Sequence, residues 1–284
     1  MIMRKSKSGF YSVLTILCIG IVAIPVVMLV LYSLESPINM KRYIESLEEV
    51  SLGQTVPIKI MVEAFSWDQY YDVLIMQPGY LRQYLNSVVY TFSITAMQVF
   101  LGSLVAFSIS CFDVPYKNTI YFLFAVLVLM PFQVLIVPNY FVLRWTNLLN
   151  TPWALLLPGF FGPFAVFLIR QYMITIPKSL IEATAIDGGN YWSAFLYVVV
   201  PVSKPAIIAA STLLFADIWN MVEQPLALLE DYTLFPLSMS LIDSSKTPGK
   251  SAFAAIVLFM IPPSLLYLYY TDDLILGIQL GDLK

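Results

Sequence analysis

Histidine is absent from this chain of 284 residues, and cysteine is nearly so. Without histidine, zinc sites and proton relays lose their commonest side chain. The two cysteines, Cys18 and Cys111, lie far apart in or beside apolar runs, so they indicate neither a disulfide framework nor a metal site. We therefore expect no metal site in this chain.

Charge is also scarce, at 12% of the residues, and the formal net charge is −3. A nucleic-acid partner would favour a basic patch, so the charge balance argues against one. Apolar residues are abundant instead, at 59% of the chain, with a mean hydropathy of +0.80. Because a soluble domain of this length rarely has so few charges, the composition predicts a protein surrounded by membrane lipid.

Six apolar runs reach the roughly 17–25 residues that a helix needs to cross a bilayer. We therefore predict an all-α membrane protein with six transmembrane helices. The first run follows a basic stretch but is too long for a signal peptide and lacks a clean cleavage site, so we interpret it as an uncleaved span. Prolines such as Pro131 and Pro138 interrupt several runs, either as packing kinks or as flexible points. The predicted spans are 10–34, 87–110, 119–143, 153–170, 205–224 and 251–270.

An even number of spans places both termini on the same side of the membrane. The basic N-terminus, residues 1–9, favours the cytoplasm, so the tail at 271–284 is expected there too. Residues 35–86 then form the largest extracytoplasmic segment, which is acidic and contains Trp67. That segment is either a solvated loop or a docking surface for an external partner.

One interior loop, residues 172–203, is polar where its neighbours are apolar. Pro177 suits the first turn of a helix, and residues 178–187 are good helix formers. Gly188 and Gly189 supply a stop, and Asn190 is a suitable cap for a second helix. We predict two short helices joined by a glycine hinge at the membrane surface. On these grounds alone the loop is either an ordinary amphipathic connector or a contact surface for another protein.

The predicted second helix has apolar side chains at three-and-four spacing. We expect these side chains to share one face, and we expect Pro201 to end the helix. The four residues of that face are Trp192, Phe195, Leu196 and Val199.

The same loop carries the pattern Glu-Ala-X-X-X-Asp-Gly, followed by a phenylalanine and a proline. This pattern resembles the cytoplasmic coupling motif of ABC-importer permeases. Thr184 and Gly189 stand where alanine is usual, and both replacements are small. The matching residues are Glu182, Ala183, Asp187, Gly188, Phe195 and Pro201.

Flanking segments sharpen the resemblance towards the carbohydrate-uptake branch, and the chain from about residue 86 to its end is similar to MalG-type permeases. The segment before it fits in position, although the outer loop is longer than usual in that family. The segments that carry the likeness are Leu149–Ala154, Leu157–Gly159, Phe167–Gln171, Trp219-Asn220, Pro225-Leu226, Tyr232–Leu234 and the ending Gly277…Gly281…Lys284.

The resemblance implies the type I importer fold, with a permease core at 87–270 and a coupling loop at 172–203 in the bacterial inner membrane. It implies a second permease, usually non-identical, two ATPase subunits that bind ATP and magnesium, and an extracytoplasmic sugar-binding protein. Glu182 would contact an ATPase, with Ala183 and Gly189 beside it in the motif. Gly188 would shape the turn, and Asp187 would anchor the helix end.

Polar residues near the fifth predicted span suggest a substrate pathway, because ionisable groups within a span are costly and usually face a cavity or a partner. Sugars suit hydrogen-bonding groups beside an aromatic ring. The acidic residues could instead pair with polar groups of the second permease. The candidates are Asp217, Trp219, Asn220 and Glu223.

We expect no catalytic residues and no cofactor in this chain. Ser244–Ser251 approaches the phosphate-loop pattern, but Ser244 replaces its first glycine, and the segment would lie outside the cell. No nucleophile–base pairing suggests other chemistry. The alternatives to an importer permease are a secondary transporter, which would show internal repeats, and a membrane scaffold. Neither would co-purify with an ATPase.

Overall fold

The computed structural model describes residues 2–48, 59, 61–246 and 251–279. Nearly all regular structure in these residues is helical, which confirms the all-α fold. The chain forms two compact units, one of Met1–Leu81 with Ser240–Met260 and one of Arg82–Met239 with Ile261–Lys284. Parts of the phosphate-loop-like segment, residues 247–250, and of the chain ending, residues 280–284, lie outside the described residues.

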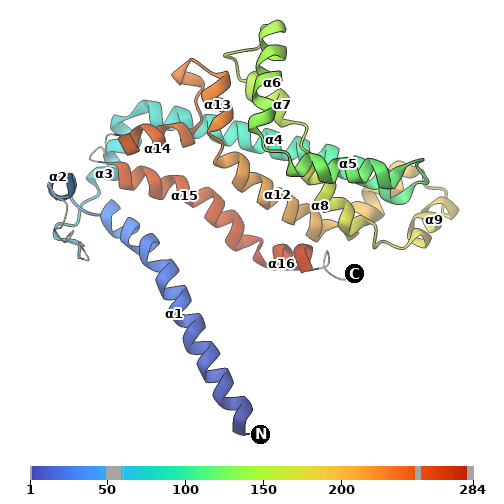
Figure 1. Ribbon diagram of the computed structural model, residues 1–284, viewed down its shortest axis with the longest axis horizontal. Helices are drawn as coiled ribbons and strands as arrows, with labels where there is room; N and C mark the ends of the chain where they lie inside the picture. The colour runs from blue at the N-terminus through green and yellow to red at the C-terminus, as the bar shows by residue number, and fades with distance from the viewer. Residues whose placement is uncertain (1, 49–58, 60, 247–250, 280–284) are drawn as a thin grey trace. The chain divides into compact units, whose positions relative to one another are not determined.

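The helices follow one another through mostly short connections (Figure 1). Residues up to 173 form α1 (Ile2–Ser33), α2 (Pro37–Glu48), α3 (Asp68–Tyr71), the π-helical η1 (Asp72–Met76), α4 (Pro78–Cys111), α5 (Lys117–Leu129), α6 (Gln133–Trp145), α7 (Trp153–Gly159) and α8 (Pro163–Met173). The remainder forms α9 (Lys178–Ile186), α10 (Tyr191–Ala194), the π-helical η2 (Phe195–Val199), α11 (Val200–Val202), α12 (Lys204–Trp219), α13 (Glu223–Leu228), the 3₁₀ turn η3 (Tyr232–Leu234), α14 (Leu237–Lys246), α15 (Ala252–Tyr269) and α16 (Thr271–Gln279).

Four helical stretches among the described residues are long and apolar enough to cross a membrane. Two further crossings arise only if each of two bent helix pairs counts as one span. The described residues therefore give the predicted six spans only if each bent pair is counted as one span, and four spans otherwise. The four stretches are Leu14–Ser33, Pro78–Cys111, Trp153–Met173 and Ala252–Tyr269.

The span predicted at 119–143 is not one straight helix. Its two parts, α5 and α6, meet at a bend of 97°. Pro131 lies in the break, and a proline lacks the N–H for a helical hydrogen bond and disfavours helical geometry in the residue before it. Met130 accordingly has the extended angles φ −73° and ψ 128°. The proline therefore marks a bend of about a right angle rather than a slight kink.

The span predicted at 205–224 is also shorter than expected. α12 ends at Trp219, and α13 begins separately at Glu223. On its other side, α12 forms a pair with the helical stretch Tyr191–Val202, bent by 75°. A crossing in this region therefore needs residues of the polar loop as well as α12.

Small residues allow helices of the second unit to approach closely. A Cβ atom added at Gly102 of α4 would lie 2.6 Å from the Cβ atom of Ala165 in α8 and 3.1 Å from its backbone carbon. A Cβ atom at Gly277 of α16 would lie 2.7 Å from the Cβ atom of Ala209 in α12. Without a hydrophobic force between helices in lipid, such close van der Waals contact is what holds them together.

Glu35 organises the described part of the outer segment in the first unit. Its carboxylate is almost fully buried and accepts hydrogen bonds from the backbone N–H groups of Glu63 and Ala64 at 2.9 and 3.0 Å. The Asn39 amide donates at 3.1 Å, and the Lys59 ammonium lies 3.1 Å away. This part of the segment is thus folded around an ion pair, rather than being an open solvated loop.

The pKa of Glu35 yields a pH prediction. Burial alone would raise this pKa, but the donors around the carboxylate outweigh burial and lower the pKa below its usual 4.5. A group whose pKa is lowered by folding stabilises the fold above its unfolded pKa, and that stabilisation disappears as the pH falls through the folded value. We expect protection of the 61–66 backbone amides from hydrogen exchange to be full at pH 7 and to fall progressively as the pH drops below about 4.5.

Glu35→Gln removes the charge and should give weak protection at both pH values. Glu45→Gln is the matched control, because Glu45 is exposed and its ion pair with Lys41 lies on the surface. Equal protection in the native chain and in Glu35→Gln at pH 7 would show that the carboxylate charge does not hold this segment.

Candidate functional site

The polar loop forms the predicted helix and glycine stop. Helix α9 runs from Lys178 to Ile186, and Gly188 has a φ of +82°, which L-residues with a side chain rarely adopt. The N–H of Gly189 donates to the Thr184 carbonyl at 2.8 Å, so carbonyls of the last turn are satisfied by the turn itself. The positive φ at Gly188 is therefore what allows the chain to reverse after α9.

The cap of the following helix is also confirmed. The Asn190 side chain accepts a hydrogen bond from the backbone N–H of Ser193 at 2.9 Å. Pro201, however, does not end the helical stretch, which continues through α11 to Val202, with the N–H of Ser203 donating to the Val199 carbonyl at 2.8 Å. The prediction that Pro201 ends the helix was wrong by one residue. Val202 keeps helical geometry, and the N–H of Ser203 still makes a helical hydrogen bond.

The apolar residues expected on one face of that stretch divide into two groups. Phe195 and Val199 are buried, whereas Trp192 and Leu196 are exposed. Burial thus follows which neighbours pack against each side of the stretch, and not the apolar spacing alone.

Most of the surface of helix α9 is not covered by other parts of the described chain. Each of its residues is exposed or half-buried, including Glu182 and Ala183, and Ile186 is 85% exposed. At its start, Lys178 forms an ion pair with Asp113 at 3.3 Å, and this lysine lowers the pKa of Asp113 below its usual 3.8. A short helix that exposes carboxylate and apolar side chains together is suited to contact another protein.

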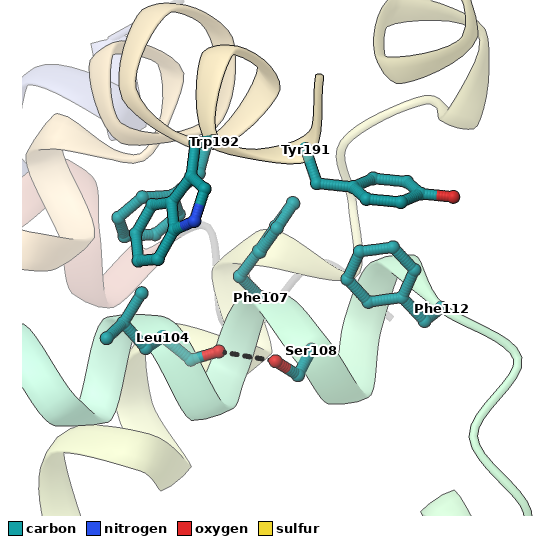
Figure 2. Close-up of a pocket in the computed structure, with 7 residues that line it drawn as sticks. Leu104, Phe107, Ser108, Phe112, Tyr191 and Trp192 are labelled. Atoms are coloured by element: carbon teal, nitrogen blue, oxygen red, sulfur yellow. Dashed lines mark hydrogen bonds between the residues drawn. The ribbon is translucent and has the colours of Figure 1, made fainter. Parts of the chain in front are cut away.

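Aromatic side chains connect α10 to the end of α4. Figure 2 shows Tyr191 and Trp192 beside Phe107 and Phe112, around a small apolar cavity of about 150 Å³. The Phe112 and Tyr191 rings meet edge to face at 4.9 Å. Phe107 also contacts the Phe195 ring at 5.3 Å. A displacement of the polar loop would therefore shift the end of α4 through these packed rings.

A larger cavity of about 710 Å³ lies elsewhere in the second unit, and its volume falls in the range of small-ligand sites, ~300–1,000 Å³. Its lining combines amide and carboxylate side chains with phenylalanine rings from several helices, a combination suited to sugars. The polar side chains are Gln98, Asn139, Asp217 and Gln224, and the rings are Phe132, Phe161 and Phe164.

Of the four pathway candidates, Asp217 lines this cavity. Trp219 is 1% exposed and stacks on Phe215 with ring centroids 5.6 Å apart. The Asn220 amide donates to the Ala216 carbonyl at 2.7 Å, which ties it back to the last turn of α12. These three candidates are neighbours in sequence, but the structure does not bring them into one site.

The fourth candidate, Glu223, is held by an amide. Its two carboxylate oxygens accept hydrogen bonds from the Gln133 amide at 2.7 and 2.8 Å, which ties α13 to α6. Phe132 and Gln224, the adjacent residues, line the cavity. Glu223 therefore does not line the cavity itself, but it holds in place the segments whose neighbouring residues do.

Sequence reasoning missed Gln98 and Asn139. Each is a polar residue inside an apolar run, and that is the signal that could have identified them. The Gln98 amide donates to the carbonyl of Gly159, and a Cβ atom at Gly162 would overlap the Gln98 side chain. Glycine at position 162 thus leaves the space in which this polar side chain lies.

Metal-binding chemistry has no candidate among the described residues, where histidine, cysteine and acidic side chains form no group of three or more that could hold an ion.

Residues 79–272 match the family described as binding-protein-dependent transport system inner membrane component. The arabinooligosaccharides transport system permease protein AraQ of Bacillus subtilis is 24% identical over 284 residues, covering 99% of this chain and 96% of AraQ. AraQ of Halalkalibacterium halodurans is 27% identical over 202 residues, covering 70% and 72%. The sn-glycerol-3-phosphate transport system permease protein UgpE of Shigella flexneri is 31% identical over 202 residues, covering 69% and 72%.

Among solved structures, a chain of a bacterial ABC transporter that imports the acidic polysaccharide alginate has a similar fold, with a TM-score of 0.71 and 18% identity over 93% of this chain and 96% of that one. A chain of the alginate transporter in complex with an alginate pentasaccharide-bound periplasmic protein has a TM-score of 0.56 at 12% identity, covering 72% and 81%. The family match spans more than half of the sequence. This chain is therefore a multi-pass membrane permease of the binding-protein-dependent transport system inner membrane component family.

Proposed function

We propose that this chain is one of two permease subunits of an ATP-driven importer for sugars. The observation that carries the proposal is the exposed helix α9, which presents the Glu-Ala-X-X-X-Asp-Gly pattern at a glycine turn. The names of the AraQ relatives, which specify arabinooligosaccharides, support sugar as the cargo. The cavity lined by amides, a carboxylate and phenylalanine rings supports the same cargo.

In this proposal α9 is the coupling helix and lies in a cleft of one ATPase subunit. Glu182 makes the polar contact, Asp187 anchors the helix end, and Gly188 shapes the turn. When ATP binding closes the ATPases, the loop moves, and the ring contacts of Tyr191 and Phe195 transmit that motion to α4. Both termini and α9 face the cytoplasm. The switch requires that the ATPase contacts differ between the inward-facing and outward-facing states.

The second permease completes the pathway. Asp217 is exposed in this chain although it lines the cavity, so one side of the cavity remains available to a partner. We infer a non-identical second permease, two ATPase subunits that hold ATP and magnesium, and a sugar-binding protein that delivers cargo from outside. The permease itself positions cargo and performs no bond chemistry.

A secondary transporter is the alternative that the structure itself raises, because such proteins use discontinuous helices and this chain has pairs bent by 97° and 75°. Affinity purification of the tagged chain from its own membranes separates the two. We expect an ATPase to co-purify and, in proteoliposomes, sugar uptake that requires both ATP and the binding protein. Uptake driven by an ion gradient without ATP would overturn the importer proposal.

A further inference from the structure

The large cavity contains a single kind of charge. Among the described residues that line it, Asp217 is the ionisable one, and its other polar side chains are the amides of Gln98, Asn139 and Gln224. Ion pairs within the described residues link Lys41, Lys59, Lys117 and Lys178 to other carboxylates. None of these ion pairs involves Asp217, so within the described residues its carboxylate has no basic side chain as an ion-pair partner.

A carboxylate without a counter-charge affects cargo according to the charge of the cargo. Neutral sugar hydroxyls can donate to it, and an ionised carboxylate accepts several such hydrogen bonds. A second carboxylate or a phosphate can donate none when ionised, and it meets a like charge. Surroundings of low dielectric strengthen this repulsion compared with water. The phenylalanine rings make part of the wall apolar, and closure of the open side by the second permease would complete such surroundings.

We propose that Asp217 makes this pathway selective for uncharged oligosaccharides and against anionic ones, such as uronates and sugar phosphates. The inference rests on the proposed function, since it assigns the cavity to cargo. It separates this chain in cargo class from relatives whose names specify sn-glycerol-3-phosphate or the acidic polysaccharide alginate. Resemblance of fold does not decide this point, because the charge of the lining is a property of a few side chains.

The test is direct binding to the complete transporter in nanodiscs without binding protein, so that the binding protein's own selectivity does not enter. The probes are the neutral alditols of arabinotriose and maltotriose, each compared with the corresponding aldonic acid, in which a carboxylate replaces the terminal CH2OH group of the same open-chain end. Saturation-transfer NMR titrations suit the weak binding expected of a transport site. We expect the neutral trisaccharide to bind at least about tenfold more tightly than its aldonate, as a like charge at short range implies.

Asp217→Asn keeps the shape of the side chain and removes the charge. It should reduce this preference to less than about threefold, mainly by tightening aldonate binding. Glu230→Gln is the matched control, because it removes an exposed acidic charge away from the cavity lining and should leave the preference unchanged. Equal affinity of the native complex for both forms of each probe would overturn the inference without needing any variant.

Other outcomes separate this inference from the proposed function. A preference that persists in Asp217→Asn would assign the selection to other groups and overturn the role of Asp217. If neither probe binds although the complex imports sugar with its binding protein, the cavity is not the cargo site. The inference then fails, while the proposed function stands. If the complex shows no ATP-dependent uptake of any sugar, the proposed function itself fails.

Discussion

Gly188→Val should reduce binding-protein-stimulated ATP hydrolysis at least tenfold, whereas Gly188→Asn should retain most of it. The reason is conformational, because a Cβ atom at this position meets nothing within 4 Å, but the backbone has a φ of +82°. A left-handed conformation costs an L-residue about 1–2 kcal/mol, most for β-branched side chains and least for asparagine. Valine should therefore unwind the turn that presents α9, while asparagine should preserve it.

Glu182→Ala tests the contact that the turn presents. The carboxylate is exposed and lies on a helix with exposed apolar neighbours, so its loss should leave this chain folded. We expect assembly with the ATPase to weaken and stimulated hydrolysis to fall at least tenfold, as for a hydrogen-bonded charge at an interface, about 2 kcal/mol or more. Ser179→Ala is the control, because it alters another exposed α9 side chain outside the motif.

Both coupling variants are to be measured in the reconstituted complex, with hydrolysis recorded with and without the binding protein. Size-exclusion chromatography shows whether the subunits remain together. Stimulated hydrolysis that is indifferent to both Gly188→Val and Glu182→Ala would remove α9 from the coupling role. The same hydrolysis in valine and asparagine variants at position 188 would show that the positive φ is not needed.

Gly102→Leu should prevent a stable second unit from forming. Any side chain at this position meets Ala165 at 2.6 Å, and backbone atoms of α8 lie within 3.1 Å, so the two helices must separate. Overpacking of a close contact costs about 1–3 kcal/mol, and backbone atoms cannot move aside as a side chain can, so we expect a value of about 3 kcal/mol or more. The readout is the amount of monodisperse protein in detergent and its melting temperature.

Three further variants isolate the cause. Gly20→Leu is the matched control, because a Cβ atom at Gly20 meets nothing within 4 Å, and it should leave the melting temperature unchanged. Gly102→Ala should lower the melting temperature, and Gly102→Ala with Ala165→Gly should recover part of the loss by removing one of the two colliding methyl groups. No recovery together with an unaffected single variant would refute close α4–α8 packing.

Local signals account for the parts of the site that were predicted correctly. The helix at 178–187, the glycine stop and the Asn190 cap depend on hydrogen bonds and backbone angles within a few residues, and the structure contains all three. The bend near Pro131 was marked by a proline, but its angle of 97° was not predictable, because it depends on what α5 and α6 pack against.

The pathway candidates show where local reasoning ends. Residues of a helix are rotated by about 100° from one to the next, so Trp219 lies nearly opposite Asp217 and packs into the core instead of lining the cavity. Gln98 and Asn139, which do line it with Asp217, come from α4 and α6. Their meeting depends on contacts between segments far apart in the chain.

The sequence by itself therefore determined that this protein is helical, apolar enough for the membrane and equipped with a short polar-loop helix that ends at a glycine turn. Transfer of apolar side chains into lipid and hydrogen bonding within a turn are properties of short segments. Only the tertiary structure decided which side chains form the cavity, that Glu223 is held by Gln133, and that the carboxylate of Asp217 is the charge at the cavity wall. These results depend on which helix faces meet, and that is set by the close packing of small residues such as Gly102 and Gly277 across helices.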